Sequence, residues 1–86
     1  MHYRPNPEQA KVIDGSGMFL LDSGSQYTHG TTDVTRTVHF GTPTNEEREM
    51  YTRVLQGHID LAAVKWPMDS GLTGSDLDCL ARRWLW

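Results

Sequence analysis

Residues 18–40 read MFLLDSGSQYTHGTTDVTRTVHF, and this stretch decides the fold. Its first part, residues 18–22, is an apolar run bounded by turn residues, which is typical of a buried strand. Its last part, residues 33–40, alternates and is rich in β-branched side chains, which favours a second strand. We expect these two strands to pair as an antiparallel hairpin with a long connection. A short extended piece is expected earlier in the chain, at residues 2–5.

Helical signals follow this hairpin. Residues 44–47, Thr-Asn-Glu-Glu, have the form of a capping box, and we expect a helix from there to about Val64. Apolar spacing predicts that one side of this helix is a core stripe made of Tyr51, Val54, Leu55, His58, Ile59 and Ala62. A second helix, capped by Thr73 or Ser75, is expected to present Leu77, Leu80, Ala81 and Trp84 on one face. This order predicts an α+β fold, an antiparallel sheet covered on one face by two helices.

Composition narrows the class of protein. The chain has 86 residues, so we expect a single domain, and its 37% hydrophobic and 22% charged residues are ordinary for a soluble protein. The net charge of −3, without a basic patch, argues against nucleic acid as a partner. No apolar run approaches the roughly 20 residues that a bilayer span needs, so we expect no membrane association. The single cysteine, Cys79, favours a reducing compartment and predicts a cytoplasmic location.

Two aspartates, Asp22 and Asp33, are the candidate metal ligands of this segment. On the expected hairpin, Asp22 ends one strand and Asp33 opens the next, so both lie at one end of the sheet. Hard divalent cations prefer carboxylate oxygens, and two converging carboxylates usually hold a cation between them. Asp-Ser-Gly is also a common turn, and an aspartate at a strand start is usually solvated. The spacing alone therefore leaves a metal site and an ordinary turn both open.

A longer pattern carries a family resemblance. Residues 20–44, LLDSGSQYTHGTTDVTRTVHFGTPT, closely resemble the aminopeptidase P (Xaa-Pro aminopeptidase) branch of the creatinase/methionine aminopeptidase superfamily. Residues 46–62, EEREMYTRVLQGHIDLA, and 77–86, LDCLARRWLW, are similar to the two helices that follow in that branch, and HYRPNP at residues 2–7 resembles its His-Tyr strand. The resemblance covers nearly the whole chain and implies part of a pita-bread fold.

The resemblance implies a set of roles. The first aspartate of the family pattern ligates one metal ion and the second bridges both ions of a dinuclear centre, commonly manganese or another divalent metal. Those positions match Asp22 and Asp33, while the family's histidine at the substrate end matches His2. The implied reaction is hydrolysis of the peptide bond before proline, so proline-containing peptides are the implied substrates.

The family pattern also needs one histidine and two glutamates from the second half of the fold, which is expected after Trp86. We therefore expect residues 1–86 to be a single partial domain that lacks three of five metal ligands. Such a chain is not expected to be competent alone, and whether it acts as an enzyme stays open. A homo-oligomer or a complementing chain is expected to cover the end formed by Trp84, Leu85 and Trp86. The alternatives are a stand-alone oligomeric binding module that retains a relic of the metal hairpin, and a remnant without a role.

Overall fold

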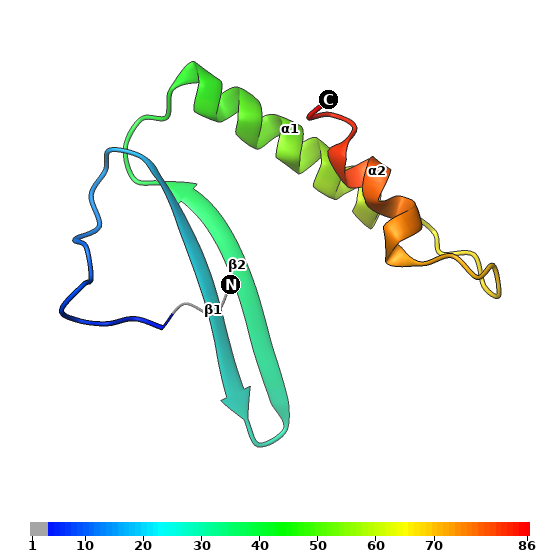
Figure 1. The fold of residues 1–86 in the computed structure, drawn as a ribbon, viewed down its shortest axis with the longest axis horizontal. Coiled ribbons are helices and arrows are strands. Elements are labelled where there is room, and N and C mark those ends of the chain that lie inside the picture. Colours follow the sequence, from blue (N-terminus) through cyan, green and yellow to red (C-terminus); the bar gives the residue numbers. More distant parts are fainter. Residues whose placement is uncertain (1–3) are drawn as a thin grey trace. The chain divides into compact units, whose positions relative to one another are not determined.

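The computed structural model describes residues 4–86, and in that range it has one two-stranded antiparallel sheet and two α-helices (Figure 1). The predicted α+β class is therefore confirmed. The chain divides into two compact units, the first ending at Pro43 and the second beginning at Thr44. Within the described range, no helix is both long enough and apolar enough for a bilayer crossing. The cytoplasmic location stays a prediction.

The first unit is built on a β-hairpin. Strand β1 is Met18–Tyr27 and strand β2 is Gly30–His39, paired from Met18 opposite His39 to Tyr27 opposite Gly30. Only Thr28 and His29 connect the strands, so the expected long connection is wrong.

Side chains near the tip explain why the strands continue to the turn. The hydroxyl of Thr32 accepts the backbone N–H of Ser25 at 3.1 Å, and the Thr31 hydroxyl donates to the Gln26 side chain. These bonds join residues that the sequence pattern assigned to the connection between the two strands. Threonine is also a residue that favours extended backbone. The extended piece expected at residues 2–5 lies partly outside the described residues, and Arg4 and Pro5 belong to no strand.

Helix α1, Asn45–Ala62, opens the second unit with the predicted capping box. The Glu47 backbone N–H donates to the Thr44 hydroxyl at 3.2 Å, and the Glu47 carboxylate accepts the Thr44 backbone N–H at 2.8 Å. These bonds satisfy two donors that a helix start otherwise leaves unpaired. The helix ends two residues before the predicted Val64.

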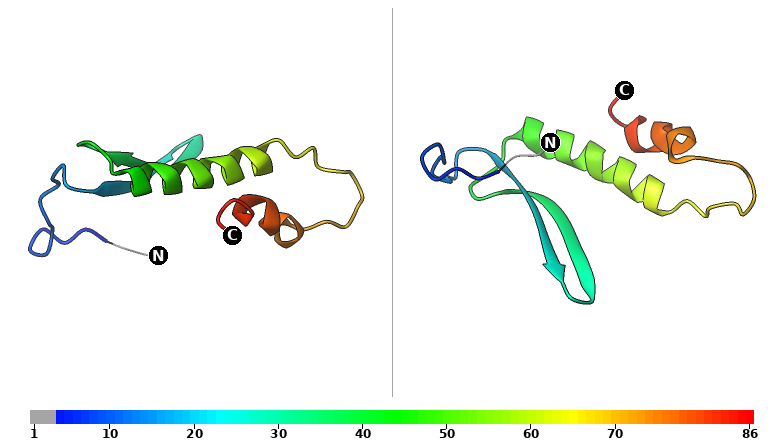
Figure 2. Two further views of the ribbon diagram at one scale, coloured as in Figure 1. Left: turned by 90° about the horizontal axis from the view of Figure 1, so that it is seen from above. Right: turned by 60° about the horizontal axis from the view of Figure 1, so that its bottom comes forward.

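A short 3₁₀ segment, η1 (Gly74–Leu77), leads into helix α2 (Asp78–Arg82), which lies beside α1 (Figures 1 and 2). Thr73, one of the two predicted caps, is the N-cap of this 3₁₀ segment, whereas Leu77 occupies that position before α2. The backbone N–H and the hydroxyl of Thr73 both donate to the Asp76 carboxylate, at 2.7 and 2.8 Å. These two bonds lower the pKa of Asp76, with the backbone bond the larger cause.

The helix pair does not use the predicted core stripe. Gly57 is the buried residue of α1, and a Cβ added there would overlap the carbonyl oxygen of Ala81 in α2. The stripe residues Tyr51, Val54 and Ile59 keep 48%, 56% and 55% of their surface exposed. Within the described residues, α2 approaches α1 at Gly57 rather than along the stripe, because close approach of two backbones needs a residue without a side chain, which apolar periodicity does not count.

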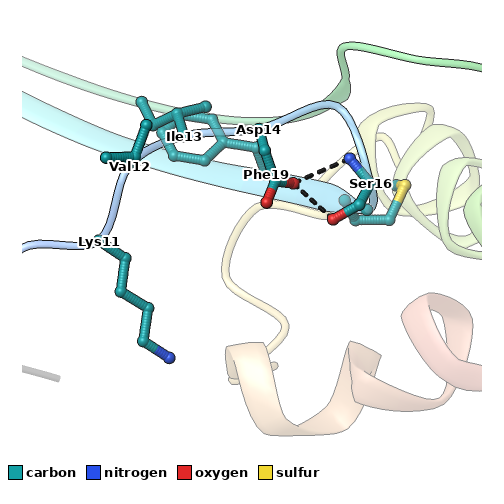
Figure 3. A pocket seen from close by; sticks show the side chains of 8 residues that line it. Lys11, Val12, Ile13, Asp14, Ser16 and Phe19 are labelled. Carbon is teal, nitrogen blue, oxygen red and sulfur yellow. Dashed lines mark hydrogen bonds between the residues drawn. The ribbon is translucent and has the colours of Figure 1, made fainter.

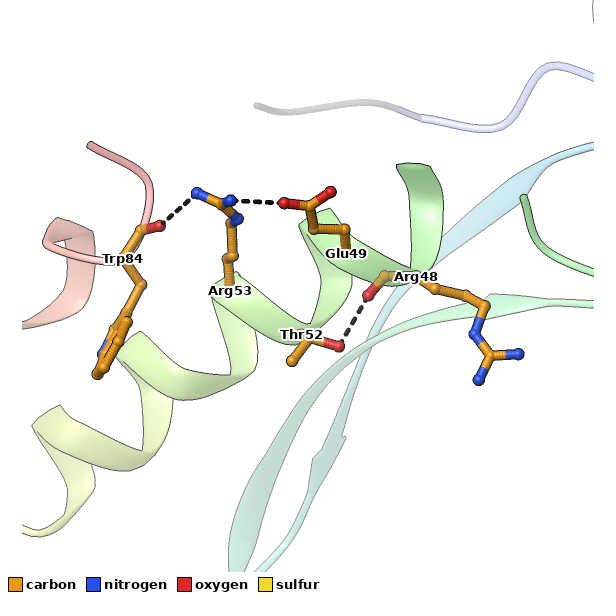
Figure 4. Close-up of polar contacts among 5 residues, drawn as sticks. All are labelled: Arg48, Glu49, Thr52, Arg53 and Trp84. Atoms are coloured by element: carbon orange, nitrogen blue, oxygen red, sulfur yellow. Dashed lines mark hydrogen bonds and ion pairs between the residues drawn. The ribbon is translucent and has the colours of Figure 1, made fainter. Parts of the chain in front are cut away.

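Polar side chains tie the end of α2 to α1. The Asp60 carboxylate accepts the indole N–H of Trp84 at 2.6 Å and the Arg83 Nε at 2.8 Å. The indole bond is the larger cause of a lowered pKa at Asp60, ahead of the Arg83 bond. Figure 4 shows Arg53 reaching from the Glu49 carboxylate at 2.5 Å to the Trp84 carbonyl at 3.3 Å. We call this set of contacts around Asp60 and Arg53 the α1–α2 clamp.

Candidate metal centre

The hairpin register decides where the two candidate ligands lie. Asp22 is directly opposite Thr35, and Asp33 is directly opposite Gly24. One intervening pair, Ser23 with Val34, separates these two pairs, and side chains alternate faces along each strand. Asp22 and Asp33 therefore share one face as diagonal neighbours, an arrangement in which Cα atoms are about 7–8 Å apart.

The position of this pair along the strands differs from the prediction. Asp22 and Asp33 were expected at strand ends, but β1 continues past Asp22 to Tyr27, and β2 begins before Asp33, at Gly30. The carboxylates therefore project from the regular part of the ladder. Their spacing is set by the backbone hydrogen bonds of the ladder, in the register that the two-residue connection fixes.

Few groups surround the two carboxylates. The Thr35 hydroxyl donates to Asp22 Oδ1 at 3.1 Å. Gly24 places no side chain opposite Asp33, and both aspartates are exposed. Within residues 4–86, no cluster of three or more histidine, cysteine or acidic side chains is arranged to hold a metal ion.

This donor set fits part of a hard-cation site. Carboxylate oxygens are the ligands that Mg²⁺, Mn²⁺ and Ca²⁺ prefer, and such ions take six or more ligands at about 2.0–2.6 Å. Two exposed carboxylates supply a minority of that number, so water or other residues must supply the rest. The pair is chemically suited to a divalent cation and insufficient to enclose one.

His39 is not brought to this pair. His39 shares the face of Asp33 but lies opposite Met18, at the other end of the hairpin, where its Nδ1 accepts the Gly41 N–H at 2.9 Å. His2 lies outside the described residues. Sequence reasoning missed Thr35, although its position two residues after Asp33 on a strand signals that it shares the face of the two aspartates.

A separate hollow of about 240 Å³ lies where the chain enters β1 (Figure 3). Within it, Asp14 Oδ1 accepts the Ser16 N–H at 2.9 Å and the Ser16 hydroxyl at 2.5 Å. The hydroxyl bond is the larger cause of a lowered pKa at Asp14. The hollow contains neither predicted metal ligand, and it is lined by Lys11, Val12, Ile13, Asp14, Ser16, Gly17, Met18 and Phe19.

Known sequences place this hairpin in a family. The sequence model of metallopeptidase family M24 matches residues 1–86. The chain is 51% identical over 86 residues to a probable Xaa-Pro aminopeptidase P of Chaetomium globosum, 50% to Xaa-Pro aminopeptidase 1 of Dictyostelium discoideum and 52% to aminopeptidase P2 of Arabidopsis thaliana. Each match covers 100% of this chain but only 14%, 13% and 12% of those proteins. With a match along its whole length, the chain belongs to metallopeptidase family M24.

Proposed function

We propose that this chain is part of the catalytic domain of a Xaa-Pro aminopeptidase and supplies Asp22 and Asp33 as two ligands of a divalent metal centre. The observation that carries the proposal is the hairpin register, which sets both carboxylates on one face as diagonal neighbours. The relatives that match all 86 residues are named Xaa-Pro aminopeptidases, and these names support the proposed reaction class.

In this proposal, the two aspartates hold the cation and offset its charge. A divalent ion held there would supply Lewis acidity toward the carbonyl of the peptide bond before proline. Manganese is the proposed ion, since oxygen-rich sites suit Mn²⁺. His2 is the proposed contact to the substrate. The remaining ligands come from outside these 86 residues, so we expect no peptide hydrolysis by the isolated chain.

Exposure of apolar side chains supports a role within a larger domain. The described residues contain no buried hydrophobic side chain, and Trp86 keeps 83% of its surface exposed. Monomeric proteins rarely leave so much apolar surface uncovered. We propose that the rest of a catalytic domain covers this surface, because the relatives are several times longer than this chain. Sedimentation of the isolated chain tests the competing arrangement, in which a second copy covers it.

A chimera tests the proposed function. These 86 residues replace the matching segment of the Dictyostelium Xaa-Pro aminopeptidase 1, to which they are 50% identical. We expect the chimera to cleave an Xaa-Pro dipeptide in the presence of Mn²⁺. Asp22→Asn and Asp33→Asn each remove a charged ligand and are expected to lower kcat/KM by at least about 100-fold.

A matched control uses an aspartate of the same unit that lies off the ligand face. Asp14→Asn removes a carboxylate that bonds only Ser16 among the described residues, and we expect its kcat/KM to stay within about threefold of the unmutated chimera. Full activity in the Asp22→Asn and Asp33→Asn chimeras would show that the two carboxylates are not ligands.

A further inference from the structure

The cross-strand partner of Asp22 is a threonine, and its hydroxyl is turned toward the carboxylate. Thr35 Oγ1 donates to Asp22 Oδ1 at 3.1 Å across the hairpin. Thr35 also follows Asp33 by two positions on β2, so it neighbours both aspartates on the shared face. No other described side chain donates a hydrogen bond to either carboxylate.

The chemistry of this contact orients the carboxylate. A β-branched side chain is stiff about χ1, so the backbone of β2 largely fixes where the Thr35 hydroxyl points. A hydroxyl that donates to an ionised carboxylate makes a charge-assisted bond, which favours one rotamer of Asp22 over the alternatives in water. The two carboxylates repel each other when no cation lies between them, so Asp22 would otherwise favour rotamers that point away from Asp33.

We propose that Thr35 is a positioning residue that holds Asp22 in the orientation that binds the cation, an inference that rests on the metal-binding role proposed above. Residues that orient a metal ligand commonly change metal affinity by 10–100-fold. Asp22 and Asp33 are exposed, so we expect the lower end of this range. Loss of the Thr35 hydroxyl should then weaken Mn²⁺ binding by about tenfold.

The hairpin contains a matched control. Thr37 has the same side chain on the same strand and the same face, but it lies opposite Leu20 rather than an acid. Thr35→Val and Thr37→Val each replace a hydroxyl with a methyl group of similar size. Valine favours strands at least as strongly as threonine, so both variants are expected to keep the hairpin. Thr35→Ser restores the hydroxyl without the methyl group.

The experiment titrates the full ¹⁵N-labelled chain with MnCl₂ and follows paramagnetic broadening of the backbone amides of Asp22 and Asp33 by NMR. This readout detects weak binding and needs no catalytic activity. Cross-strand contacts between Asp22 and Thr35 in the metal-free spectrum check the register in each variant. Asp22→Asn and Asp33→Asn are measured in parallel, because they test the metal site itself.

We expect Thr35→Val to need about tenfold more Mn²⁺ for the same broadening, with Thr35→Ser and Thr37→Val within about threefold of the unmutated chain. If Thr35→Val binds like the unmutated chain while the asparagine variants lose binding, the positioning role is wrong and the metal site stands. If broadening is unchanged in Asp22→Asn and Asp33→Asn, both proposals are wrong. Should valine disturb the register, Thr35→Ala takes its place as the variant without a hydroxyl, and Mn²⁺ binding in Thr35→Ala that equals binding by the unmutated chain contradicts the role of the hydroxyl.

Discussion

Replacing Gly57 by alanine has two opposite effects. It stabilises α1 as a helix, and it weakens the docking of α2 against α1. Alanine is favoured over glycine inside a helix by about 1 kcal/mol, so α1 alone gains stability. The added Cβ would overlap the Ala81 carbonyl oxygen and lie 2.9 Å from its carbonyl carbon. Backbone atoms cannot rotate out of the way, and carbon atoms at contact prefer about 3.5–4.0 Å, so α2 must recede.

The expected change in α2 docking depends on whether each effect acts on the docked state, the undocked state or both. The helix-propensity gain is present whether or not α2 is docked, so it cancels in the docking equilibrium. The steric cost of overpacking, about 1–3 kcal/mol, acts on the docked state alone. We therefore expect the ratio of docked to undocked α2 to fall by roughly 5- to 150-fold in Gly57→Ala. The α1–α2 clamp is expected to open, because Asp60 can no longer reach both Arg83 and Trp84.

Two measurements resolve these effects. The indole N–H resonance of Trp84 reports docking, since that group donates to Asp60 at 2.6 Å, and far-UV circular dichroism reports helix content. Gly74→Ala adds the same methyl group in η1, where a Cβ has no heavy atom within 4 Å, and it is expected to leave the indole resonance unchanged. An unchanged indole resonance in Gly57→Ala, together with a higher thermal midpoint, would refute the close backbone contact.

Two further predictions concern the ends of the helices. The pKa of Asp60 is lowered in the folded state, so its contribution to docking is present above the unfolded value near 3.8 and is lost as pH falls through the folded pKa. Acidification below the folded-state pKa of Asp60 should shift the Trp84 indole resonance toward the frequency of undocked α2. The Asp60→Asn variant should already show that frequency at pH 7 and change little on acidification. Thr44→Ala removes the hydroxyl half of the capping box and should destabilise α1 by about 1 kcal/mol, measured as faster amide exchange in its first turn.

Local chemistry was the part of the fold that the sequence predicted well. The start of α1 depends on four neighbouring residues, so Thr44 and Glu47 identify it without reference to the rest of the chain. The face that α2 contacts could not be predicted in the same way. It depends on Gly57 permitting a close approach, and apolar periodicity instead pointed to the stripe containing Tyr51 and Val54.

The candidate site was predictable in its residues but not in its geometry. In this register, residues that face each other differ in number parity, as Asp22 opposite Thr35 and Gly24 opposite Asp33 illustrate. A connection of three residues instead of two would shift the pairing by one and put Asp33 on the face opposite Asp22. Because the predicted connection was long and of unspecified length, the sequence alone did not decide which face each aspartate occupies.

Exposure distinguishes this pair of carboxylates from a complete metal site. The ladder sets how Asp22 and Asp33 lie relative to each other, and that spacing does not depend on a hydrophobic core. Affinity depends on burial, because the attraction between a cation and a carboxylate is many times weaker in water than in a protein interior. On the proposed function, the hairpin therefore determines where the cation binds, while the polypeptide that covers this face determines how tightly it is held. Chimera and isolated chain should accordingly lose Mn²⁺ binding through the same two substitutions but from very different starting affinities.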